Sequence, residues 1–211
     1  MRRGILAGAA GLGFACGSSS PEPGAPPPPE AAPAAAAAAA LRPAITGRVQ
    51  YYDIDGTSPG ELREQIKRLG PRDEGAPRDA LTVWNLEWAY HEATGPSGGS
   101  CGLRDVRVTL DLETTLPRWT PPQGASPSLV QTWRTYLDHV KVHEAGHRRI
   151  AEQNARDLMN ALTALRGTTC KEAWDQASPT AERIVSEGRV KNRAYDLETK
   201  HGQTQGVVLG P

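Results

Sequence analysis

Two histidines and a glutamate near the middle of the chain have the spacing of a metal site. Residues 143–147 read His-Glu-Ala-Gly-His, which is the H-E-x-x-H pattern. Residues four apart lie on one side of a helix, so His143 and His147 can bind one metal ion. Glu144 lies one step round the helix and can reach a water molecule on that ion. The pattern predicts a zinc site that hydrolyses amide bonds, with Glu144 as the general base.

This motif falls within a long predicted helix. Across residues 128–165, apolar residues recur every three or four positions, which predicts a helix with one stripe facing a core. Between Val140 and Ala151 the motif residues occupy the inward positions of that stripe. Burying two histidines and a glutamate without a ligand would be costly. The placement therefore favours a metal site over a solvated polar patch.

A catalytic zinc site needs a third protein ligand and an open position for water. The extended pattern H-E-x-x-H-x-x-G-x-x-H is absent, because Ile150 and Gln153 stand where it needs Gly and His. With no spare cysteines, the third ligand must be His, Asp or Glu, as in a catalytic site. The candidates are His91, His139, His201, Glu172, Glu182 and Glu187.

The elements that position the motif read as a small antiparallel sheet with helices. Alternating residues predict strands at 49–54, 82–90 and 106–112. A capped helix is expected over residues 58–70, and a last helix over residues 178–195, where Ser-Pro forms the start signal. The predicted fold class is α+β, with a small antiparallel sheet packed against a long H-E-x-x-H helix and a C-terminal helix.

Composition places one domain after an N-terminal extension. The chain has 24 Lys+Arg against 24 Asp+Glu, so it is neither a polycation nor an acidic tail protein. The basic stretch 189–193 is too short and too mixed to indicate nucleic acid. Residues 46–211 are enough for one core. Cys101 and Cys170 are left as one disulfide pair in an oxidising compartment, with two buried thiols as the alternative.

The first 45 residues have the composition of a targeting signal followed by a linker. A basic start and a short apolar run predict a signal peptide over residues 1–16, too short to span a bilayer. Ala15-Cys16 resembles a bacterial lipoprotein processing site, although Gly13 stands where Leu is usual. Acylation of Cys16 would anchor the chain to a membrane, and plain cleavage would secrete it. Residues 17–45, rich in Pro and Ala, predict a disordered linker.

The C-terminal string at residues 195–206 (YDLETKHGQTQG), taken with the motif helix, resembles a known family. It is similar to the bacterial predicted secreted zinc-dependent proteases, also called domain of unknown function 922. The similarity covers essentially residues 48–206. It implies a zincin-like fold, zinc as cofactor, Glu144 as catalytic residue and His201 as the ligand that joins His143 and His147.

Two further roles are expected near this string. Tyr195 would donate a hydrogen bond to the oxyanion, and Asp196 would orient a ligand imidazole from behind. A core tyrosine and a surface or helix-end acid are the alternatives for these two residues.

Together these features predict a zinc metallopeptidase of the bacterial cell envelope. It would act on peptides or proteins from the periplasmic or extracellular side, lipid-anchored or secreted. One alternative is a non-catalytic, zinc-stabilised lipoprotein that binds a partner. Another is an amidase that cleaves cell-wall peptides.

Overall fold

Three long strands form the sheet on which the helices pack. The computed structural model describes residues 42–93 and 101–210. Strand β5 (Cys101–Trp119) lies in the middle, between β1 (Ala44–Ile54) and β4 (Leu81–Ala93). The short strand β6 (Arg166–Gly167) pairs with the start of β5. β4 and β1 therefore lie at the two edges of this sheet.

The sheet is mixed, which corrects the prediction of an antiparallel one. β4 and β5 run antiparallel, but β1 runs parallel to β5. Parallel neighbours need a crossover connection. Here the connection consists of α2 (Pro59–Leu69), a small hairpin of β2 (Arg72–Asp73) and β3 (Ala76–Pro77), and β4 itself. The alternation of residues in β1 predicted a strand but carried no information about its partner or direction.

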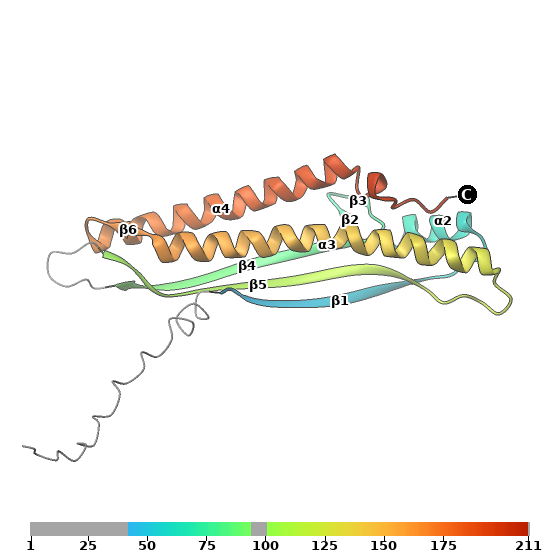
Figure 1. Ribbon diagram of the computed structural model, residues 1–211, viewed down its shortest axis with the longest axis horizontal. Coiled ribbons are helices and arrows are strands. Elements are labelled where there is room, and N and C mark those ends of the chain that lie inside the picture. Colours follow the sequence, from blue (N-terminus) through green and yellow to red (C-terminus); the bar gives the residue numbers. More distant parts are fainter. Residues whose placement is uncertain (1–41, 94–100, 211) are drawn as a thin grey trace, which may run out of the picture.

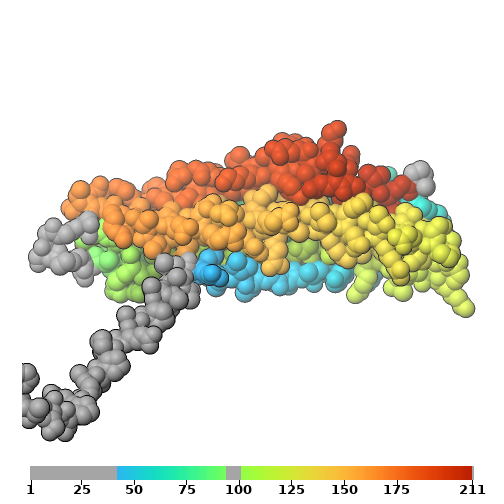
Figure 2. Space-filling model, viewed as in Figure 1, coloured from blue at the N-terminus to red at the C-terminus, as the bar shows by residue number. Residues whose placement is uncertain are grey.

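Two long helices cover one face of the sheet (Figure 1). α3 (Pro127–Ala164) runs along it, and α4 (Cys170–Thr199) returns antiparallel beside α3. Figure 2 shows α3 and α4 side by side along the long axis, with β1 at the opposite border. The α+β class is confirmed, and α3 begins within one residue of the predicted start because Ser126 caps it.

The start of α4 differs from the prediction. The helix begins at Cys170, not at Ser178, because the hydroxyl of Thr169 accepts the backbone N–H of Glu172 at 3.1 Å. The Glu172 carboxylate in turn accepts the backbone N–H of Thr168 at 2.8 Å, which provides a second hydrogen bond at the start of α4. Pro179 then lies inside the helix. Its missing hydrogen bond is offset by fully buried alanines on the core side.

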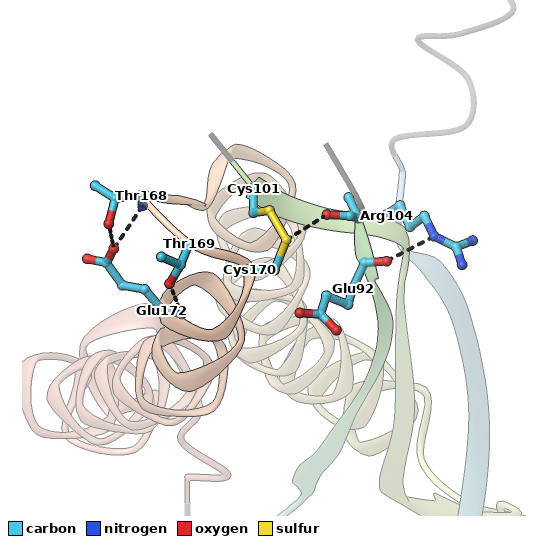
Figure 3. The surroundings of a disulfide bond; sticks show 8 residues. Glu92, Cys101, Arg104, Thr168, Thr169, Cys170 and Glu172 are labelled. Atoms are coloured by element: carbon cyan, nitrogen blue, oxygen red, sulfur yellow. Dashed lines mark hydrogen bonds between the residues drawn. A yellow bond between two sulfur atoms is a disulfide. The ribbon is translucent and has the colours of Figure 1, made fainter. Parts of the chain in front are cut away.

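The predicted disulfide is confirmed. Cys101 and Cys170 are bonded, which joins the first residue of β5 to the first residue of α4 (Figure 3). The bond holds the start of α4 against the sheet at the end of the molecule where the strand and helix both begin.

Two apolar clusters lie between the sheet and the helices. One contains Leu86 and Leu110 of the sheet with Leu158 of α3, and the other contains Leu62 of α2 with Val140 of α3. Val140 belongs to the second cluster and Ala151 to the first. The motif His-Glu-Ala-Gly-His lies on α3 between these two residues. The polar gap seen in the sequence is thus the junction of two clusters.

The N-terminal predictions lie mostly outside the described residues. This holds for the signal peptide, for Cys16 and for residues 17–41 of the linker. β1 begins at Ala44, two residues before the predicted domain boundary. Within residues 42–93 and 101–210, none of the helices has the length and apolarity needed to cross a membrane.

Candidate metal centre

α3 presents the three motif side chains to the interior. His143, Glu144 and His147 are 6%, 5% and 5% exposed. Around them lie β4, α4 and the C-terminal segment that follows α4. The predicted inward placement of the motif is confirmed, and each of these buried polar groups must find a partner.

Three donor atoms converge at this point. The Nε2 atoms of His143 and His147 are 3.2 Å apart, and Asp196 Oδ1 is 3.2 Å from the first and 3.1 Å from the second. A tetrahedral zinc ion with bonds of about 2.0 Å holds neighbouring ligand atoms about 3.3 Å apart. The triangle therefore has the size of one face of a zinc coordination tetrahedron.

The far nitrogens of both imidazoles are bound by amide oxygens. His143 Nδ1 donates to Gln205 Oε1 and His147 Nδ1 donates to Asn192 Oδ1, each at 2.9 Å. These bonds place the ring hydrogens on Nδ1 and leave lone pairs on the two Nε2 atoms. Two lone pairs and a carboxylate oxygen then face one another, an arrangement that a bound cation stabilises.

The electrostatics of the site favour a positive charge next to Asp196, which either a proton or a metal cation can supply. Burial by itself would raise the pKa of Asp196, but hydrogen bonds with His143 and His147 hold it below the usual range. Burial would lower the pKa of His147, whereas Asp196 and Asn192 raise it overall. The carboxylate is therefore ionised, and the site favours positive charge beside it.

Glu144 is held by a residue that the sequence did not single out. Thr82 of β4 donates its hydroxyl hydrogen to Glu144 Oε2 at 2.6 Å. Burial raises the pKa of Glu144 above its usual value, although the bond from Thr82 opposes the shift. A carboxylate with a raised pKa is a better proton acceptor. Alternation placed Thr82 on the inward face of a strand, but nothing local indicated its partner.

Tyr195 packs against both histidines and is not among the residues that line the cleft over the donor atoms. Its ring stacks on His143 with centroids 5.1 Å apart, and its hydroxyl contacts the His143 carbonyl at 3.3 Å and the Gln205 amide at 3.0 Å. Gly146 makes room for it, because a Cβ there would collide with the hydroxyl. This placement favours the alternative of a core tyrosine over a residue that binds an oxyanion. The stacking on His143 also supports the orientation of that ring.

His201 lies next to the triangle and is not one of its corners. Its Nδ1 is 3.3 Å from Asp196 Oδ1, and its side chain is 41% exposed. The donor atoms that lie within 4.8 Å of one another belong to His143, His147 and Asp196. The structure thus places Asp196 where the sequence predicted His201.

The turn after α4 explains the position of His201. Lys200 and His201 both have left-handed backbone angles, and Gly202 follows with a positive φ. Three such residues reverse the chain and direct the segment with the short helix η1 (Gln203–Gln205) back over α3. Gln205 reaches His143 in this way.

The other candidate ligands have different partners or places. His139 contacts the carbonyl of Gly206, and Glu187 pairs with Arg183. Glu172 caps α4. His91, near the end of β4, and Glu182, on α4, are exposed. None of them belongs to the group of convergent donors.

A cleft of about 600 Å³ opens over the three donor atoms and Glu144. One wall is the start of β4, residues 81–84, together with the hairpin of β2 and β3. The opposite wall is α4, and the segment 207–209 closes one end. A ligand in the cleft would meet the convergent donors directly.

A family comparison covers the residues of this site. A family model described as bacterial protein of unknown function (DUF922) matches residues 49–202. The chain belongs to this family. The resemblance seen in the sequence is confirmed at that level, and the matched range contains the motif, Asp196 and His201. No curated protein and no solved structure gives a significant match.

Proposed function

We propose that the protein is a zinc metallopeptidase that hydrolyses peptide bonds in the cleft beside α3. The observation that carries the proposal is the triangle formed by His143 Nε2, His147 Nε2 and Asp196 Oδ1, with sides of 3.1–3.2 Å. Its size fits tetrahedral zinc and leaves a fourth position toward the cleft. Glu144 lines the same cleft.

Each residue around the triangle has a distinct task. Gln205 and Asn192 fix the two imidazole rings in the tautomer that a metal requires. Zinc held there would act as a Lewis acid and lower the pKa of a bound water toward 7.

Glu144 performs the proton transfers. It takes the proton from the attacking water and delivers it to the leaving nitrogen of the substrate. Thr82 holds the carboxylate in place through its 2.6 Å hydrogen bond.

The surroundings favour an extended peptide over a compact substrate. β4 is an edge strand, and its residues 81–84 line the cleft. Free backbone groups on a sheet edge pair with extended chains. A motif helix packed under an edge strand that binds the substrate is a zincin-like arrangement. The corresponding location is the bacterial cell envelope, where the enzyme is either secreted or anchored through Cys16.

The two alternatives use the same site differently. An amidase acting on cell-wall peptides would need the same metal and base. A non-catalytic zinc-stabilised lipoprotein would use the three ligands to join α3 to α4, and Glu144 would have no catalytic task.

The test combines metal content with turnover. Zinc per chain and hydrolysis of a peptide library are measured for the wild type, His147→Ala and Glu144→Gln. Glu152→Gln, two turns along α3 and outside the cleft, is the matched control. We expect one zinc per chain in all but His147→Ala, and loss of turnover by about 10³-fold or more in Glu144→Gln.

Other outcomes contradict the proposal. A wild type without zinc under metal-replete conditions would remove its basis. Zinc with no hydrolysis of peptides would favour the non-catalytic lipoprotein, and hydrolysis confined to cell-wall peptides would favour the amidase.

A further inference from the structure

The α4 wall of the cleft carries two arginines that form no ion pair with any of the residues that the structure describes. Arg189 and Arg193 lie one helical turn apart, are exposed, and line the cleft. Within residues 42–93 and 101–210, no carboxylate oxygen lies within 4.0 Å of either guanidinium. By contrast, Arg63 and Arg78 in the same cleft pair with aspartates at 2.7 and 3.7 Å. The charge on the α4 wall is therefore available to a ligand.

The two arginines lie on the same helix as Asp196, so their spacing along α4 from this donor residue is known. Arg193 and Arg189 precede Asp196 by three and seven residues on one helix. At 1.5 Å per residue they are displaced by about 4.5 and 10 Å along α4. An extended peptide advances about 3.3 Å per residue. For a peptide that runs along α4 with its scissile bond at the metal ligands, the two cations are level with the first to third residues on one side of that bond.

The other end of the cleft has a different character. Because α3 and α4 are antiparallel, the residues of α3 that precede His143 and the residue Arg189 of α4 lie on opposite sides of the donor atoms. Val140 and the C-terminal residues Val207 and Leu209 line that end. The Arg63–Asp79 ion pair lies at the same end, next to Tyr136. The cleft therefore has two cations that are unpaired among the described residues on one side of the donor atoms, and apolar side chains with an already paired arginine on the other.

We propose that Arg189 and Arg193 select substrates with a carboxylate within three residues of the scissile bond, on one side only. A guanidinium binds a carboxylate through two parallel hydrogen bonds, which gives both affinity and orientation. The carboxylate belongs to an Asp or Glu side chain or to the C-terminus of the peptide. This specificity rests on the proposed peptidase function.

The test uses the zinc-loaded mature chain and random octapeptides, made with either free or amidated C-termini. Cleavage products are sequenced for the wild type and for the double variant Arg189→Gln/Arg193→Gln. The control is Arg183→Gln/Lys191→Gln, which removes the same charge from α4 outside the cleft. Zinc-loaded Glu144→Gln, immobilised, is tested in parallel for which octapeptides it retains.

We expect acidic residues to be enriched about tenfold on one side of the cut, since a hydrogen bond to a charged group contributes at this level. The enrichment disappears in the first double variant and persists in the control. Enrichment confined to the free C-terminal library assigns the effect to the terminal carboxylate.

Two results overturn the proposal. One is cleavage by the wild type without acidic preference, and the other is equal enrichment in both double variants. If nothing is cleaved, the peptidase function fails, and retention by the Glu144→Gln protein decides the specificity separately. Retention of acidic peptides supports the carboxylate site, whereas retention without such preference contradicts it.

Discussion

Replacing Asp196 by alanine should remove zinc from the protein, and replacing His201 should not. Asp196 Oδ1 is the third corner of the donor triangle, 3.1 and 3.2 Å from the two Nε2 atoms. His201 contacts that oxygen at 3.3 Å from a partly exposed position. Loss of an outer partner weakens metal binding about 10- to 100-fold. Loss of a direct ligand should exceed about 100-fold, or about 2.7 kcal/mol.

The assay is competition with a chromophoric zinc chelator at neutral pH. Asp196→Ala and His201→Ala are compared with Glu198→Ala, an exposed acid on the same turn of α4. Circular dichroism establishes that each variant is folded. Zinc retained by Asp196→Ala would refute the reasoning. An equal or larger loss in His201→Ala would restore the three-histidine site that the sequence predicted.

Other predictions concern the support of the site. Gly146→Ala should displace Tyr195 and destabilise the protein by about 1–3 kcal/mol while weakening zinc binding, because the new Cβ meets the tyrosine hydroxyl. Gly60→Ala, where nothing lies within 4 Å, should be neutral or stabilising in the same thermal and zinc titrations. Thr82→Val removes a hydrogen bond that lowers the pKa of Glu144. Since the base acts when deprotonated, the acidic limb of kcat/KM should move to higher pH, and an unchanged limb would contradict the assignment. Replacing both disulfide cysteines by serine opens a link between residues 69 apart. It should cost about 4 kcal/mol and lower Tm by about 10 °C, with the zinc Kd unchanged in the folded protein.

Local signals in the sequence predicted several elements correctly. The periodicity of residues 128–165 predicted α3, and Ser58 with Glu61 predicted the start of α2. Such signals lie within a few residues of the feature that they determine. The start of α4 was predicted wrongly because two capping signals compete. The one at Thr169 prevails, since burial of alanines on α4 keeps Pro179 inside the helix.

By itself, the sequence determined the motif helix, the family and which two cysteines could pair. Helical spacing places His143, Glu144 and His147 together, because residues four apart share a face. Only the tertiary structure decided that Asp196 completes the triangle, and that Thr82, Asn192 and Gln205 support it. These contacts span 45 to 62 residues of chain. They depend on how α4 packs against α3 and on the left-handed turn that moves His201 aside, which no local pattern specifies.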